Sequence, residues 1–182
     1  MRTFALAGLL ALALAAAGAW WVWDSEPEWY LRARYPLRYE AILTAHADNY
    51  DLEPALLAAV VYTESKFDPD ARSAAGAVGL MQLLPETAQG IALRTGGDRF
   101  DVDDLLDPEI NVRYGSWYLR NLLRRYDDLP TALAAYHAGP GNVDRWRRAN
   151  VGVQFPETRA YVEKVLRLRE VYRSAYADEL AG

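Results

Sequence analysis

The chain has 182 residues, enough for one ordinary domain with a buried core and too few for three. Its 25 acidic residues outnumber its 20 basic residues, and the net charge of -5 argues against a protein that binds nucleic-acid backbones. Because the chain has no cysteine, disulfides, thiolate metal sites, cysteine nucleophiles and lipid attachment to an N-terminal cysteine are excluded. The two histidines lie far apart in the sequence, so no metal site is expected.

An apolar segment near the N-terminus raises the hydrophobic content of the chain to 52%. Residues 4–23 carry no charge, and a helix of this length spans about 30 Å, the thickness of a membrane's hydrocarbon core. Arg2 precedes the segment and acidic residues follow it, which predicts that the rest of the chain lies outside the cytoplasm. The length favours an uncleaved signal anchor over residues 1–23. The alternative is a signal peptide cleaved near Ala19, which would release the protein.

Proline, glycine and aspartate divide the remaining chain into a series of expected helices, with no convincing alternating strand. We interpret residues 24–35 as a polar and aromatic linker and residues 36–182 as one mainly α-helical domain. Proline suits the first helical position and asparagine suits the cap before it. On this basis the expected helices begin at Pro36, Pro54, Pro85, Pro108, Pro130, Asn142 and Pro156.

The acidic run over residues 101–107 admits two interpretations, a calcium loop or the caps of helices. An EF-hand loop that began at Asp101 would need glycine at its sixth place and glutamate at its twelfth, where this sequence has Leu106 and Val112. We therefore interpret the run as helix capping.

One carboxylate stands where a helix is expected to be apolar. In the helix expected over residues 54–65, Leu57, Val60 and Val61 define a buried stripe, and Glu64 is the next position on it. An unpaired buried carboxylate is costly, so its pKa should rise, as a general acid working near neutral pH requires. Periodicity alone leaves open, and by itself favours, a glutamate that turns to solvent at the helix end.

Short motifs follow this glutamate in a particular order and spacing. They are Glu64-Ser65, Gly79-Leu80-Met81-Gln82, Asn111-Val112-Arg113-Tyr114-Gly115, Ala135-Tyr136-His137-Ala138-Gly139 and the segment from Pro156 to Val162. Each motif alone is common. Together, over about residues 37–170, they resemble the soluble-type lytic transglycosylases (SLT domain), which are relatives of goose-type lysozyme.

The resemblance implies a lysozyme-like fold of the α+β superfamily, mostly helical, with a groove that binds the glycan strands of peptidoglycan. It implies cleavage of the β-1,4 bond between N-acetylmuramic acid and N-acetylglucosamine without a cofactor, leaving a 1,6-anhydromuramyl end. Glu64 would correspond to the family's single acid and base. Ordinary glycosidases need two carboxylates, but one suffices when the nucleophile belongs to the substrate. Asp68 and Asp70, the nearest acids, fit turn formation better.

Other positions follow from the same resemblance. Ser73 and Gln82 are expected to bind sugar in the groove, and Tyr136 and Tyr161 are expected beside the acid, where a hydroxyl would orient it and tune its pKa. The family usually has asparagine where His137 stands, which leaves the role of Glu64 intact and puts in doubt any contact made at that position. Without the motifs, each of these residues would fit an ordinary loop, cap or core role.

Two alternative functions remain open from the sequence, a hydrolytic muramidase on the same fold and a non-catalytic scaffold that binds peptidoglycan. The presence of Glu64 with its expected partners argues against the scaffold. The expected binding partners of the protein are glycan strands and, through residues 4–23, the membrane. The sequence leaves open whether Trp117 belongs to the core or stacks on sugar, and the arginines around Trp146 fit a solvated helix face.

Overall fold

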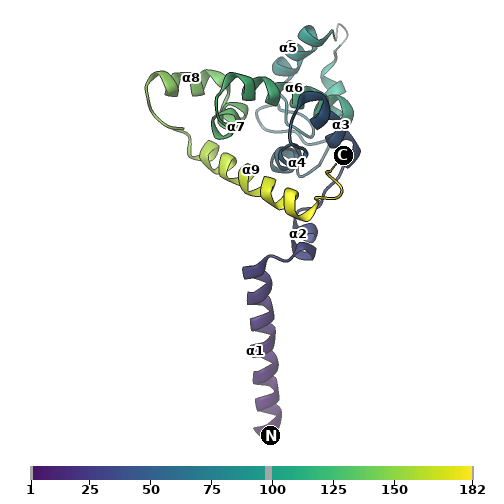
Figure 1. Ribbon diagram of the computed structural model, residues 1–182, viewed down its shortest axis with the longest axis vertical. Coiled ribbons are helices and arrows are strands. Elements are labelled where there is room, and N and C mark those ends of the chain that lie inside the picture. Colours follow the sequence, from purple (N-terminus) through teal and green to yellow (C-terminus); the bar gives the residue numbers. More distant parts are fainter. Residues whose placement is uncertain (1, 97–99, 182) are drawn as a thin grey trace. The chain divides into compact units, whose positions relative to one another are not determined.

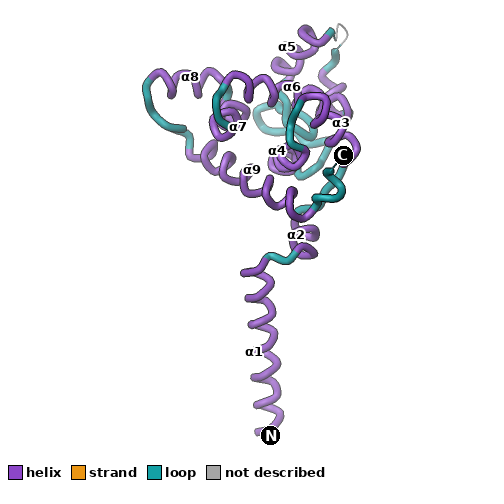
Figure 2. Tube along the Cα trace, in the orientation of Figure 1, coloured by secondary structure: helices purple, strands orange, loops and turns teal. Residues whose placement is uncertain are grey.

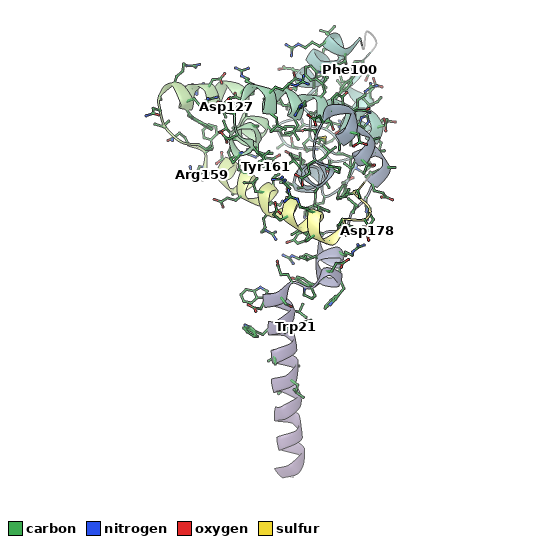
Figure 3. All side chains as sticks on the ribbon, viewed as in Figure 1. Trp21, Phe100, Asp127, Arg159, Tyr161 and Asp178 are labelled. Atoms are coloured by element: carbon green, nitrogen blue, oxygen red, sulfur yellow. The ribbon has the colours of Figure 1, made fainter. Side chains whose placement is uncertain are left out.

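The structure is a computed structural model that describes residues 2–96 and 100–181, and in the first helix it omits the side chains of residues 2–11, 13 and 19. The chain forms two compact units, residues 1–36 and 37–182. The first unit contains α1 (Arg2–Ser25) and α2 (Glu28–Arg34). The tryptophans of α1 lie toward its C-terminal end, where Trp21 is labelled (Figure 3).

The first unit differs in one respect from the sequence-based expectation. The segment interpreted as a linker over residues 24–35 contains the short helix α2, because Glu28 in its first turn pairs with Arg32 one turn later at 2.8 Å. Within the apolar run of residues 4–23, the side chains of residues 4–11, 13 and 19 lie outside the described residues. Among the described residues, no helix has the length and apolar character needed to cross a membrane.

The second unit is helical (Figure 1). Among its described residues extended pairing is limited to two isolated bridges, Arg72 with Val78 and Val78 with Leu83, so only helices and loops appear in the tube view (Figure 2). Its elements are α3 (Glu40–Tyr50), α4 (Pro54–Ser65), α5 (Pro85–Thr95), the 3₁₀ helix η1 (Val102–Leu106), α6 (Pro108–Arg125), α7 (Leu129–Ala138), α8 (Pro140–Arg148) and α9 (Pro156–Ala175).

Most expected helix starts are confirmed, and two are wrong. The helix expected from Pro36 begins instead at Glu40, after Tyr39 in a left-handed conformation. The helix expected to be capped by Asn142 begins at Pro140, directly after Gly139. Asn142 instead donates through Nδ2 to the Ala138 carbonyl oxygen at 2.8 Å and so satisfies the end of α7.

The acidic run caps two elements, as expected. The Asp101 carboxylate accepts from the Asp103 N–H, and the Asp104 carboxylate accepts from the Asp101 N–H, so the two form a capping box at η1. The Asp107 carboxylate then accepts from the Ile110 N–H at the start of α6.

The core forms around α4, which packs most extensively against α9. All residues of α4 from Ala55 to Val61 are buried, so the stripe expected on one face extends around the whole helix. In α9, Tyr161, Val165, Leu168 and Tyr172 form a buried stripe at helical spacing. The packing of these two helices brings the C-terminal turn of α4 close to the N-terminal half of α9, and this is where the candidate site lies.

Candidate active site

Glu64 occupies the last turn of α4, which ends at Ser65 and is followed by Lys66 in a left-handed conformation. Burial raises the pKa of the Glu64 carboxyl from its usual range to about 7, while the Tyr161 hydroxyl and the Lys164 ammonium lower that pKa by smaller amounts. The carboxyl is therefore partly protonated at neutral pH, and it can both donate and accept a proton there. The expectation that burial raises this pKa is confirmed.

Two tyrosines approach Glu64 from different helices. Tyr161 of α9, labelled in Figure 3, is 7% exposed, and among the described residues its buried hydroxyl has no hydrogen-bond partner of good geometry. That hydroxyl nevertheless interacts with the Glu64 carboxyl. Tyr136 of α7 donates its hydroxyl to the Met81 carbonyl oxygen at 2.8 Å. Burial, and then the Glu64 charge, raise the pKa of both tyrosines well above the usual value, so both hydroxyls stay protonated.

The loop between α4 and α5 supplies the opposite side of the site. Ser73 accepts the Ala77 N–H on its Oγ at 3.0 Å, which closes a tight turn and leaves the hydroxyl proton available. Gln82 has a positive φ of 48°, and its side-chain Nε2 donates to the Ala71 and Gly79 carbonyl oxygens, both at 3.0 Å. The amide hydrogens of Gln82 thus bind the protein, and its Oε1 is the atom left to accept a bond from a ligand.

His137 follows Tyr136 at the end of α7 and is exposed. Its Nδ1 lies 3.0 Å from the Oγ1 of buried Thr158, and its ring lies 4.5 Å from the Tyr161 ring between centroids. Partial burial lowers the pKa of the imidazole, and the Glu157 charge raises it by a smaller amount, so the ring is mainly neutral at pH 7. Sequence reasoning did not identify Thr158, although it lies within the Pro156 to Val162 motif.

All the residues expected in the site line one cavity of about 280 Å³ except Tyr161, which approaches Glu64 from α9. A second cavity of about 250 Å³ shares Gln82, Leu84, Tyr136 and His137 with the first, so the two form a continuous groove. Among the described residues that line this groove, Glu64 is the sole carboxylate. The first cavity is lined by Glu64, Ser73, Ala75, Ala77, Gln82, Leu84, Tyr136 and His137.

The groove continues beyond the expected residues. Tyr118 and Pro140 belong both to the second cavity and to a third of about 320 Å³, which Trp117 also lines. Trp117 is partly buried against the core around Val78, so it serves in the core and also faces the third cavity. Sequence reasoning assigned no role to Tyr118, and its place next to Trp117 in α6 was the available signal.

Other residues considered from the sequence lie outside this groove. His46 is buried, and its Nε2 lies 2.8 Å from the Glu109 carboxylate, which gives it a structural role. Asp68 accepts the Asp70 N–H at 3.0 Å, as expected for a turn. Trp146 is buried and packs edge-on against Phe155, with ring centroids 4.9 Å apart, while its flanking arginines are exposed.

The fold and the site define a helical domain with one partly buried glutamate of raised pKa in an elongated groove. Residues 42–156 match the Transglycosylase SLT domain family, and the chain belongs to that family. It is 32% identical over 164 residues to the soluble lytic murein transglycosylase of Salmonella typhimurium, a match that covers 84% of this chain and 25% of the relative. It is 37% identical over 131 residues to the transglycosylase of Enterobacteria phage PRD1, with 72% of this chain and 43% of that protein covered.

A solved structure supports the same assignment. The structure of an inactive glutamate-to-glutamine mutant of the lytic transglycosylase Slt from Pseudomonas aeruginosa superimposes with a TM-score of 0.75 and 31% identity. The match covers 91% of this chain and 30% of that chain. The chain thus spans about a quarter of the length of the soluble lytic transglycosylase of Salmonella typhimurium and under a third of the Pseudomonas aeruginosa structure.

Proposed function

We propose that this protein is a peptidoglycan lytic transglycosylase that cleaves the β-1,4 bond between N-acetylmuramic acid and N-acetylglucosamine. The observation that carries the proposal is the single carboxylate in the described groove, with its pKa raised by burial to about 7. A glycosidase that uses water normally needs a second carboxylate to activate it or to attack the sugar. A groove with one carboxylate suits a reaction in which the substrate supplies its own nucleophile.

In the proposed reaction Glu64 first acts as an acid. Its protonated carboxyl donates to the glycosidic oxygen as the bond from that oxygen to the muramyl C1 breaks. The muramyl 6-hydroxyl then attacks C1, and its proton passes to the Glu64 carboxylate. The products are a free N-acetylglucosamine 4-hydroxyl and a 1,6-anhydromuramyl end, with no water consumed and the acid restored.

The neighbouring residues have distinct proposed roles. The Tyr161 hydroxyl orients Glu64 and limits the rise of its pKa. Gln82 offers Oε1 to a sugar hydroxyl or amide N–H, because its Nε2 is already bonded to backbone carbonyls. The Ser73 hydroxyl donates toward the sugar beside the acid, and His137 lines the groove without taking part in proton transfer.

We also propose that residues 4–23 attach the protein to the cytoplasmic membrane, with residues 36–182 as the catalytic domain on the periplasmic or cell-wall side. This rests on the uncharged apolar run with a basic residue before it and acidic residues after it. Signal-peptide cleavage near Ala19 would instead give a secreted protein. Mass determination of the mature N-terminus in membrane and soluble fractions distinguishes the two.

The activity is tested by digesting purified sacculi with the full chain and weighing the released muropeptides. Transglycosylase products carry anhydro ends and are one water lighter than hydrolysis products. Reducing muramyl ends would instead establish a hydrolytic muramidase. Binding to sacculi with no release of muropeptides would establish a non-catalytic scaffold.

A further inference from the structure

We propose that Asn111 of α6 is a positioning residue for the site, because its side chain holds the Val78–Gln82 loop in the one conformation that brings Gln82 and the Met81 carbonyl to Glu64. The inference rests on the proposed function and adds to it a residue that does not line the groove. Asn111 is 0% exposed and belongs to the motif over residues 111–115. These residues do not line the two cavities of the groove, and the proposed reaction gives them no role.

The Asn111 carboxamide is bonded entirely to backbone groups. Its Oδ1 accepts the Met81 N–H at 2.7 Å, and its Nδ2 donates to the Val78 and Leu105 carbonyl oxygens at 2.9 and 2.8 Å. The partners fix the orientation of the amide, because a backbone N–H can only donate and a carbonyl can only accept. All three bonds are buried. Removing the side chain leaves the Met81 N–H and the Leu105 carbonyl without a partner, while the Val78 carbonyl keeps its bond from the Leu83 N–H.

The loop depends on this side chain. Within the loop, backbone hydrogen bonds join Val78 to Leu83 and Gln82 to Gly79. None of them uses the Met81 N–H, which donates to Asn111 instead. The loop also follows a tight path with φ of 80° at Gly79 and 48° at Gln82. Such positive φ values need support from outside the turn, especially at a residue other than glycine.

Two glycines allow α6 to approach the loop this closely. A Cβ added at Gly79 would lie 2.2 Å from Asn111 Nδ2, and a Cβ added at Gly115, one turn after Asn111, would lie 2.2 Å from Met81 Sδ. Asn111 and Gly115 therefore form one contact surface on α6, and Gly79 and Met81 form the complementary surface on the loop.

The held peptide connects directly to the site. Met81 gives its N–H to Asn111 and receives the Tyr136 hydroxyl on its carbonyl oxygen at 2.8 Å. Tyr136 lines the cavity with Glu64, and Gln82 is the next residue along the chain. If Asn111 is removed, the loop relaxes, Tyr136 loses its fixed partner, and water gains access to Glu64.

The test compares Asn111→Ala with Leu43→Ala, a matched core substitution in α3, in the full chain in non-ionic detergent. Leu43 is 0% exposed and belongs to α3, outside the Val78–Gln82 loop, so its truncation destabilises the fold at another position. We expect Asn111→Ala to lower kcat on sacculi by about 10- to 100-fold, because small misplacements of reacting groups are costly. We also expect the ¹³C NMR titration midpoint of the Glu64 carboxyl to fall. Leu43→Ala should leave both nearly unchanged.

The outcomes separate this inference from the proposed function. A folded Asn111→Ala protein with the parent's kcat and Glu64 midpoint overturns the positioning role even if the parent cleaves sacculi. A lowered midpoint in a protein whose parent lacks activity supports the positioning role and rejects the proposed function. If Asn111→Ala does not fold, Gly115→Ala displaces Met81 while leaving the Asn111 amide in place. The same lowered midpoint is expected there, and an unchanged one overturns the inference.

Discussion

The Tyr161 hydroxyl, on the first half of α9, interacts with the Glu64 carboxyl at the end of α4, and it is the second strongest influence on that carboxyl's pKa after burial. No described group forms a hydrogen bond of good geometry with this buried hydroxyl, and the Glu64 carboxyl is the acidic group with which it interacts. The hydroxyl favours the charged carboxylate, while burial favours the protonated carboxyl. The balance leaves the pKa of Glu64 at about 7.

Tyr161→Phe should therefore raise the pKa of Glu64 above its present value of about 7. Since the reaction begins with the protonated acid, the high-pH limb of kcat/KM should move to higher pH. The maximal rate should fall, because the carboxyl loses the group that orients it. The pH profile of sacculus cleavage measures both changes. A limb that moves to lower pH would contradict the interaction.

Glu64→Gln should abolish cleavage while leaving binding to sacculi intact. General acid catalysis contributes about 10²- to 10⁴-fold, and the amide can neither donate nor accept the reacting proton. Release of muropeptides and co-sedimentation with sacculi measure the two properties separately. Cleavage by the Gln variant at the parent rate would show that another group is the acid.

The same substitution should stabilise the fold above pH 7. The pKa of Glu64 is raised in the folded state, so the folded protein binds more protons than the unfolded chain between its usual pKa and about 7, and stability falls as pH rises through that window. Removing the charge should raise the free energy of unfolding by up to about 3 kcal/mol at pH 8, with no difference at pH 4. Urea unfolding of parent and variant at both pH values tests this. An equal gain at both would assign the effect to packing.

His137→Asn should leave cleavage at pH 7 within about threefold of the parent, because the neutral imidazole does not exchange a proton with substrate. In the parent, the His137 ring should titrate below the usual histidine value, since partial burial lowers its pKa. NMR spectra at a series of pH values measure that titration. The chain has two histidines, and the signal that is missing from the His137→Asn protein belongs to His137. A His137 midpoint above the usual value would contradict the described environment.

Asp128→Ala should reduce stability by about 1 kcal/mol without changing activity. The Asp128 carboxylate accepts both the N–H and the hydroxyl of Thr131 at 2.8 Å and caps α7. Asp128→Asn keeps an acceptor at the cap and should lose less. Thermal unfolding of the three proteins, beside their cleavage rates, provides the comparison. A loss of activity in the folded Asp128→Ala protein would mean that the cap also positions Tyr136.

Local sequence signals located most of the helices because their causes are local. Pro54, Pro85 and Pro156 each open a helix as expected, since proline's fixed φ suits the first helical turn. The exceptions involve contacts made elsewhere. Pro36 precedes Leu37, whose N–H donates to the Tyr176 hydroxyl at 3.2 Å, and the helix begins only at Glu40. Asn142 caps the end of α7 because α8 has already begun at Pro140.

The sequence by itself determined the helical domain, the position of Glu64 on an apolar helix and the motifs that mark the family. Only the tertiary structure decided that α4 is buried on all sides from Ala55 to Val61, and that burial raises the pKa of Glu64 in its last turn to about 7. It also decided that the Gln82 amide donates its hydrogens to backbone carbonyls, and that Asn111 accepts the Met81 N–H from 30 residues away. Burial and such hydrogen bonds depend on which helices pack together. The sequence pattern of a single helix does not show which other helices it will contact.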